Sequence, residues 1–208
     1  MRDYFIVLPE TTILRSVIPE LKDLYLLVYS SNDEFLQSLG AFHIDDIHED
    51  KHNFVINIDK IDPIRFPNIY HLRNNTEIGQ QFLSKALFFI ETDTRKGIDN
   101  RAQRVVPHRH HEPAVINFPL INCNEMSVVN FYRTEDVNDS TYSVYGVGYN
   151  STGQYEPIAS LSTRDGYPII LNSHQYHSVE NHANARRIMA GWHMRDEITW
   201  EKVLAHFA

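Results

Sequence analysis

The pattern of apolar and polar residues changes character near residue 104. Before this point, residues 4–8 and 25–29 are rich in apolar β-formers, which predicts two buried strands. Residues 54–58 alternate between apolar and polar positions, as a half-buried strand does. The first half of the chain therefore contributes strands, although it also contains helical patterns.

Three segments have the spacing of amphipathic helices. Residues 32–39 begin with a residue type that caps helices and continue with apolar residues three and four positions apart. Thr76 precedes a series of apolar residues on one helical face, which predicts a helix over about 77–90. A last helix is expected at 196–207, at the end of the chain.

From Arg104 onward the chain consists of short β-rich segments separated by turn residues, with no helical pattern between them. Such a series is typical of an antiparallel barrel or jelly roll. We therefore predict an α+β, mainly β fold, with a mixed α/β support region at 1–103 and a β core at 104–193. No repeat, linker or charge block marks a second domain, so 1–208 is expected to form a single domain. The predicted strands cover residues 105–110, 114–120, 127–132, 142–148, 168–171, 177–180 and 187–192.

Composition and charge exclude several classes of partner. The 208 residues include 19 Lys and Arg against 27 Asp and Glu, a formal charge of −8, and basic residues form no stripe that could follow a nucleic acid backbone. The apolar runs are far shorter than the roughly 20 residues that span a bilayer. With no signal-peptide pattern and a single cysteine, Cys123, we expect a cytoplasmic protein that binds neither membrane nor nucleic acid. Oligomeric state is not predicted.

Histidine is unusually frequent, with 12 residues, and the densest cluster lies at 107–113. In an extended segment, alternation places His108, His110 and Glu112 on one face. Two imidazoles on one face can share a metal ion, since their neutral nitrogens suit iron, zinc, copper and nickel. The alternative is a solvent-exposed hairpin that is rich in histidine.

A second segment, residues 166–181, shifts the balance toward a metal site. Gly166 enters an apolar strand, and His177 and Asn181 follow it at the spacing of the second cupin motif. The segment resembles the late strand pair of the double-stranded β-helix, the fold of cupins and of iron(II)/2-oxoglutarate-dependent dioxygenases. The resemblance covers about 104–193 and implies that His177 is the distal iron ligand.

The same resemblance implies a binding site for 2-oxoglutarate. In these dioxygenases a basic residue nine or ten positions after the distal histidine binds the far carboxylate, and Arg186 lies nine positions after His177. A guanidinium suits this role because it donates two hydrogen bonds to one carboxylate. Trp192 lies six positions after Arg186, and an aromatic residue at this distance is common in the prolyl-hydroxylase-like branch. We expect Arg186 to bind 2-oxoglutarate, with Arg187 as the alternative if it does not turn outward.

The first motif departs from the dioxygenase pattern, in which a histidine, any residue and then Asp or Glu precede a strand. If His108 is the first ligand, His110 stands where the acid is expected; if His110 is first, Glu112 supplies the acid but the following turn becomes very short. We expect the metal ligands to be His108, His110 and His177, with Glu112 as the first substitute. The histidines without a partner at ligand spacing, expected at the surface or in polar contacts, are His71, His174, His182, His193 and His206.

The resemblance as a whole implies a small iron(II)/2-oxoglutarate-dependent dioxygenase with a double-stranded β-helix core, N-terminal helices packed on one sheet and a C-terminal helix. Such an enzyme oxidises a small molecule or a protein side chain while 2-oxoglutarate is decarboxylated to succinate. Two alternatives remain open: a cupin-type metalloprotein that does not use 2-oxoglutarate, and a metal-free binding module. The missing acid of the first motif supports the last of these.

Overall fold

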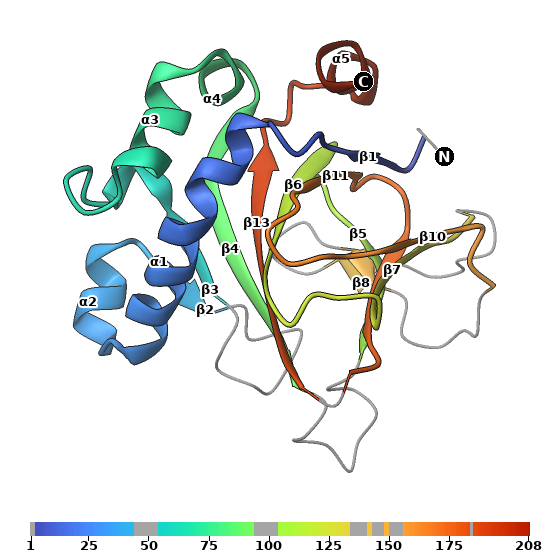
Figure 1. Ribbon diagram of the computed structural model, residues 1–208, viewed down its shortest axis with the longest axis horizontal. Helices are drawn as coiled ribbons and strands as arrows, with labels where there is room; N and C mark the ends of the chain where they lie inside the picture. Colours follow the sequence, from blue (N-terminus) through green and yellow to red (C-terminus); the bar gives the residue numbers. More distant parts are fainter. Residues whose placement is uncertain are drawn as a thin grey trace.

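The computed structural model describes residues 3–43, 54–93, 104–133, 141–142, 148–149, 156–183 and 185–208. Within these residues the chain forms two antiparallel sheets, with the helices of the first half gathered on the side of the larger one (Figure 1). The predicted fold class, an α+β, mainly β double-stranded β-helix, is confirmed.

The described residues place seven strands in the larger sheet and six in the smaller. The larger sheet has the order β1-β11-β6-β13-β4-β3-β2, with β1 at Phe5–Val7, β2 at Phe42–His43, β3 at Phe54–Asn57, β4 at Leu83–Asp93, β6 at Ala114–Ile121, β11 at Ile169–Asn172 and β13 at Arg186–Met194. The smaller sheet has the order β10-β7-β12-β5-β9-β8, with β5 at Arg104–Arg109, β7 at Ser127–Phe131, β8 at Thr141–Tyr142, β9 at Gly148–Tyr149, β10 at Ala159–Ser162 and β12 at His177–Asn181.

The helices precede β4 or follow β13, and several begin at the caps that the sequence indicates. Asn32 accepts a hydrogen bond from the backbone N–H of Phe35, and Thr76 accepts one from Gly79. The helices are α1 (Ile18–Ser30), α2 (Asp33–Ser38), α3 (Pro67–Asn75), α4 (Glu77–Gln81) and α5 (Trp200–Phe207), with short 3-10 helices η1 (Ile13–Val17) and η2 (Ile58–Lys60).

Most strands of the second half lie where the alternation predicts them, within one or two residues. The predicted strand at 142–148 is wrong, because Thr141 pairs with Tyr149 and Tyr142 with Gly148, so the chain reverses between them. Residues 143–147 themselves lie outside the described part of the chain. Sequence patterns indicate neither α3 nor β10.

The apolar run at 25–29, predicted to be a strand, forms the last turns of α1. The buried residues Leu21, Leu24, Tyr25 and Val28 follow the i, i+3, i+4, i+7 spacing of one helical face, whereas Leu26 is exposed. Five apolar residues are too few to distinguish a helix from a strand, and only the longer window shows the helical period.

The helix predicted over 77–90 is correct only up to Gln81, after which the chain forms β4. This strand lies between β13 and β3, so that Phe89 pairs with Ala190 on one side and with Phe54 on the other. A strand covered on both faces is apolar at consecutive positions, and such a run also satisfies a helical face. Pairing with two neighbours therefore overrides the helical pattern.

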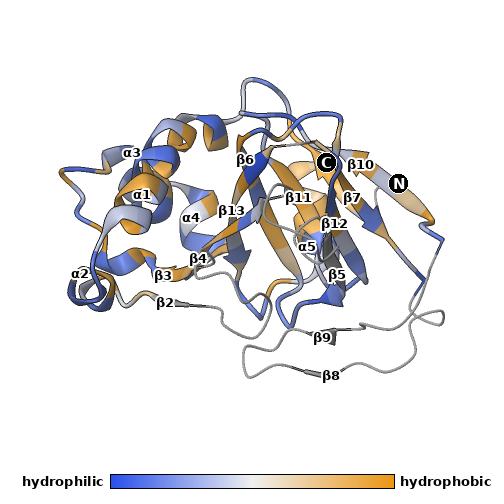
Figure 2. Ribbon diagram, turned by 90° about the horizontal axis from the view of Figure 1, so that it is seen from below, coloured by the Kyte–Doolittle hydropathy of each residue, from blue (hydrophilic) through white to orange (hydrophobic). Residues whose placement is uncertain are grey.

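Two apolar clusters hold the structure together. The larger lies between the helices and the outer face of the larger sheet, and includes Leu21 and Leu24 of α1, Ile116 of β6 and Trp192 of β13. The smaller cluster fills the space between the sheets. Figure 2 shows apolar residues in the strands on both sides of this space. Among the described helices, none has the length and apolar composition that crossing a membrane requires.

Candidate metal centre

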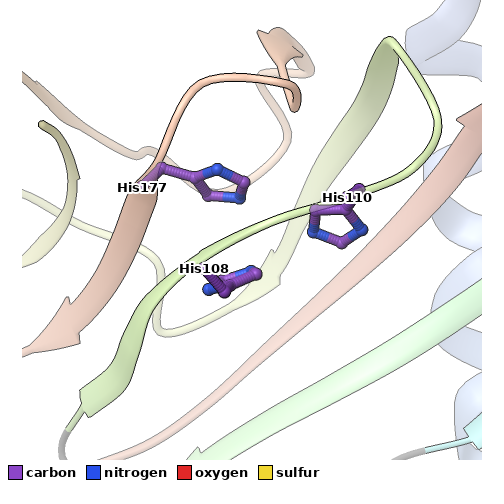
Figure 3. Close-up of side chains that lie close together, drawn as sticks. All are labelled: His108, His110 and His177. Carbon is purple, nitrogen blue, oxygen red and sulfur yellow. The ribbon is translucent and has the colours of Figure 1, made fainter. Parts of the chain in front are cut away.

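Three histidines meet between the two sheets because β5 and β12 are neighbours in the smaller sheet. His108 of β5 is the register partner of His177, the first residue of β12. His110 follows β5, and its backbone N–H donates a hydrogen bond to the carbonyl of Ser173 at 2.9 Å. Figure 3 shows the three imidazole rings close together, two from the β5 segment and one from β12. Strand register thus joins two motifs that are far apart in sequence.

The imidazole rings lie at the distances expected for a shared ligand site. Ring centroids are 4.3 Å apart for His108 and His177, 5.1 Å for His108 and His110, and 5.4 Å for His110 and His177. One ring nitrogen from each lies within 4.8 Å of the other two. Metal–nitrogen bonds of about 2.0–2.1 Å place two ligands of one ion up to about 4.2 Å apart. Small side-chain rotations are therefore enough to bring all three onto one ion.

The environment keeps the imidazoles of His110 and His177 neutral. Burial lowers the pKa of His177 to about 4. Burial also lowers the pKa of His110 well below its usual value, and the neighbouring His108, His177 and His193 lower it further. His177 Nδ1 lies 2.9 Å from the carbonyl oxygen of Gln175, which can only accept, so Nδ1 carries the hydrogen and Nε2 keeps its lone pair. Neutral imidazoles with free lone pairs are the form that binds metals.

The arginine that faces this site is Arg187, the alternative to the favoured Arg186. Arg187 is 1% exposed and lines a cavity together with His108, His110 and His177. Its Nη2 contacts the sulfur of Met189 at 3.4 Å, and none of the described carboxylates forms an ion pair with it. The other residues around the cavity are Phe88, Ile90, Val115, Asn117, Val179 and Met189.

Arg186, the residue favoured by the spacing, points to the opposite face of β13. Its Nη2 lies 2.6 Å from Glu91 Oε2 in an ion pair and also contacts the hydroxyl of Tyr25 on α1. The two arginines are adjacent on a strand and therefore face opposite sides of the sheet. Spacing alone could not fix which of them faces inward, because a shift of one residue exchanges the two faces.

Glu112 does not join the three-histidine group but lies beside a residue that sequence spacing missed. Its Oε1 is 2.9 Å from His193 Nδ1, and ligand atoms of His110, Glu112 and His193 lie within 4.8 Å of one another. Burial opposes the ionisation of Glu112, but the hydrogen bond and charge of His193 lower its pKa. The missed signal is alternation along β13, which places His193 on the face of Arg187 and Met189.

The cavity between Arg187 and the histidines is small, at about 20 Å³. This is close to the space of a single water molecule. Its walls are mostly apolar, so a charged group inside it would be shielded from solvent. The pocket can therefore hold a metal ion, whereas a larger ligand requires its side chains to move.

Comparisons with known proteins support the fold. No protein-family model matches the sequence, and no curated protein matches it. Among solved structures, the epimerase SnoN in complex with Fe3+, alpha ketoglutarate and nogalamycin RO is similar with a TM-score of 0.55 and 11% identity, over 92% of this chain and 78% of SnoN. The non-heme alpha ketoglutarate dependent carbocyclase SnoK from nogalamycin biosynthesis is similar with a TM-score of 0.51 and 10% identity, over 91% of this chain and 79% of SnoK. At these identities the likeness shows a shared fold.

Proposed function

We propose that this protein is an iron(II)/2-oxoglutarate-dependent oxygenase, with the metal held by His108, His110 and His177 and the co-substrate held by Arg187. One observation carries the proposal. A fully buried arginine with no acidic partner among the described residues lines the same cavity as three convergent imidazoles. Arg187 takes the role that the sequence spacing gave to Arg186.

The buried guanidinium favours an anionic ligand. Removing an unpaired charge from water is costly, and proteins offset this cost by pairing the charge or by binding a counter-ion. A carboxylate is the natural partner, because it accepts two parallel hydrogen bonds from the guanidinium fork. A ligand that reaches from a metal to Arg187 needs a metal-binding group at one end and a carboxylate at the other, as 2-oxoglutarate has.

The donor set fits iron(II), which accepts imidazole ligands. A bound iron ion would activate dioxygen, which would oxidise both 2-oxoglutarate, giving succinate and carbon dioxide, and the substrate. The chain's own part is orientation and exclusion of water: Arg187 fixes the far carboxylate, and Phe88, Ile90 and Val179 surround the site with apolar surface. The fold shared with SnoN, whose structure contains Fe3+ and alpha ketoglutarate, agrees with this assignment.

A second candidate is a cupin-type metalloprotein that does not use 2-oxoglutarate. Two observations favour it: the three histidines include no carboxylate, and the cavity of about 20 Å³ is smaller than 2-oxoglutarate. In the oxygenase, Arg187 and the apolar side chains must therefore move apart when the co-substrate enters.

The two candidates are separated by titrating 2-oxoglutarate into the anaerobic iron(II)-loaded protein and recording the metal-to-ligand charge-transfer band. The oxygenase gives a band, and Arg187→Lys keeps the charge but loses the bidentate contact, so affinity falls by about 10- to 100-fold with iron content unchanged. Arg186→Lys is the matched control and leaves the band as it is. If the protein binds iron but gives no band, it is the cupin-type metalloprotein. If it binds no iron, it is the metal-free binding module.

The finer expectations from the sequence stay proposals. A small molecule or a protein side chain as substrate, the cytoplasmic location and the absence of membrane or nucleic acid partners rest on composition and resemblance. The spacing between the arginine and Trp192 no longer supports the prolyl-hydroxylase-like branch, because Trp192 lies five rather than six positions after the inward-facing Arg187.

A further inference from the structure

A second group of metal-binding side chains lies beside the three-histidine cluster and shares one member with it. His110, Glu112 and His193 each offer a ligand atom within 4.8 Å of the other two. The ring centroids of His110 and His193 are 5.3 Å apart, and the rings meet edge to face. The group combines two imidazoles with one carboxylate, whereas the first cluster contains imidazoles alone.

Unsatisfied polar atoms mark this group as incomplete. His110 Nδ1, Glu112 Oε2 and His193 Nε2 are all buried and have no hydrogen-bond partner in the described part of the chain. A buried polar atom without a partner destabilises the folded state, and folded proteins contain few of them. Three such atoms on three neighbouring residues show that the polar contacts of this group are incomplete without a further bound group.

The contact between Glu112 and His193 does not by itself satisfy the two side chains. It joins Oε1 to Nδ1 at 2.9 Å and leaves the other carboxylate oxygen and the other ring nitrogen free. Neighbouring ligand atoms of one ion lie about 3 Å apart when each metal–ligand bond is about 2.0–2.2 Å, so an ion that replaces the Nδ1 hydrogen can be held by Oε1 and Nδ1 together. The pair is thus preorganised for a cation rather than closed on itself.

We propose that His110, Glu112 and His193 form a second metal-binding set, which competes with the set of His108, His110 and His177 for one divalent ion. Competition follows because a neutral imidazole that binds through one nitrogen serves one ion at a time, and His110 belongs to both sets. The ion therefore has two positions, one with three neutral ligands and one with a carboxylate that cancels part of its charge. This proposal concerns the metal alone and does not depend on 2-oxoglutarate.

The test removes the first set and asks whether an ion is still held. In His108→Ala/His177→Ala, titration with Co(II) should still give one ion per chain, with visible absorption bands that differ from those of the wild type. Adding His193→Ala or Glu112→Gln should lower Co(II) affinity by about 100-fold or more, since even losing a supporting residue costs 10- to 100-fold. Adding His111→Ala is the matched control, because this neighbouring histidine is exposed and belongs to neither set.

Three results would overturn the proposal. The first is a double variant that keeps the far-UV circular dichroism of the wild type but binds no Co(II). The second is a double variant whose Co(II) affinity is unaffected by both His193→Ala and Glu112→Gln, which would place the ion elsewhere. The third is a wild type that binds two Co(II) ions per chain at saturation, which would refute the competition. A wild type that binds Co(II) but, when loaded with iron(II), gives no charge-transfer band with 2-oxoglutarate refutes only the oxygenase.

Discussion

Replacing Glu91 by glutamine removes a negative charge from a buried contact that joins α1, β4 and β13. The Glu91 side chain is 4% exposed, and its Oε2 lies 2.6 Å from Arg186 Nη2 and accepts a hydrogen bond from the Tyr25 hydroxyl at 2.9 Å. Glutamine has nearly the same shape and keeps an acceptor for Tyr25. The substitution therefore isolates the loss of charge pairing with Arg186.

The size of the effect follows from the exposure of the arginine that is left behind. Breaking a fully buried ion pair by removing one partner costs about 3–5 kcal/mol. Arg186 is 27% exposed on its side chain and stacks over the Tyr29 ring at 4.5 Å, so water and the aromatic ring stabilise part of its charge. We expect the free energy of unfolding to fall by about 2–3 kcal/mol in Glu91→Gln.

The assay is urea unfolding followed by tryptophan fluorescence, since Trp192 is completely buried. Glu197→Gln is the matched control, because Glu197 is 69% exposed and lies 3.9 Å from Arg195, so its loss should cost about 0.5 kcal/mol or less. Metal and 2-oxoglutarate affinity should stay unchanged in Glu91→Gln, because Arg186 faces away from the cavity. The reasoning is refuted if the two variants lose equal stability at equal m-value, or if Glu91→Gln weakens 2-oxoglutarate binding as Arg187→Lys does.

Two further predictions concern the same strands. In Gly191→Ala the new methyl group would overlap the Phe88 ring, so we expect a loss of about 2–3 kcal/mol, a melting temperature lower by about 5–10 °C, and partial recovery when Phe88→Leu is added; an unchanged melting temperature would contradict the packing. Burial first, and then the charge and hydrogen bond of Glu91, raise the pKa of Tyr25 above its ordinary value near 10. In the unfolded chain the Tyr25 hydroxyl loses its proton near pH 10, whereas in the folded chain it keeps the proton. The contribution of Tyr25 to the free energy of unfolding is therefore fully present below pH 10 and is lost as the pH rises above it. Urea midpoints measured at about pH 9 and pH 11 should therefore fall less in Tyr25→Phe than in the wild type, and an equal fall in both would count against the shift.

Alternation and turn residues were sufficient to predict most of the β core. Residues 114–120 and 187–192 lie in β6 and β13, close to the predicted bounds, because short strands between turns leave few other structures for these residues. The strand predicted at 25–29 and the second half of the helix predicted over 77–90 are wrong, because a buried helix and a buried strand can share the same local composition. Only packing against distant residues decides between them.

The candidate site shows the same division between local and tertiary information. His108, His110 and His177 could be found from spacing, because each lies at a strand end in a recognisable motif. The inward direction of Arg187 depends on the phase of β13, which is set by pairing with β4 and β6. His193 approaches Glu112 only in the folded chain, so no sequence spacing connects them.

The two adjacent arginines fix the alignment of β13 only in part. If β13 slid by one position, one arginine would take the place of the other, and Ala185 or Ile188 would stand where the second guanidinium is needed. One of the two guanidinium positions would still be filled, so the alignment is fixed more strictly further along the strand. Gly191 fixes it, because its missing side chain makes room for the Phe88 ring, and Trp192 adds a hydrogen bond from Nε1 to the carbonyl of Ser84 at 3.0 Å. A slipped strand would place a larger side chain against Phe88, so a glycine in the middle of the sheet selects which arginine faces the cavity.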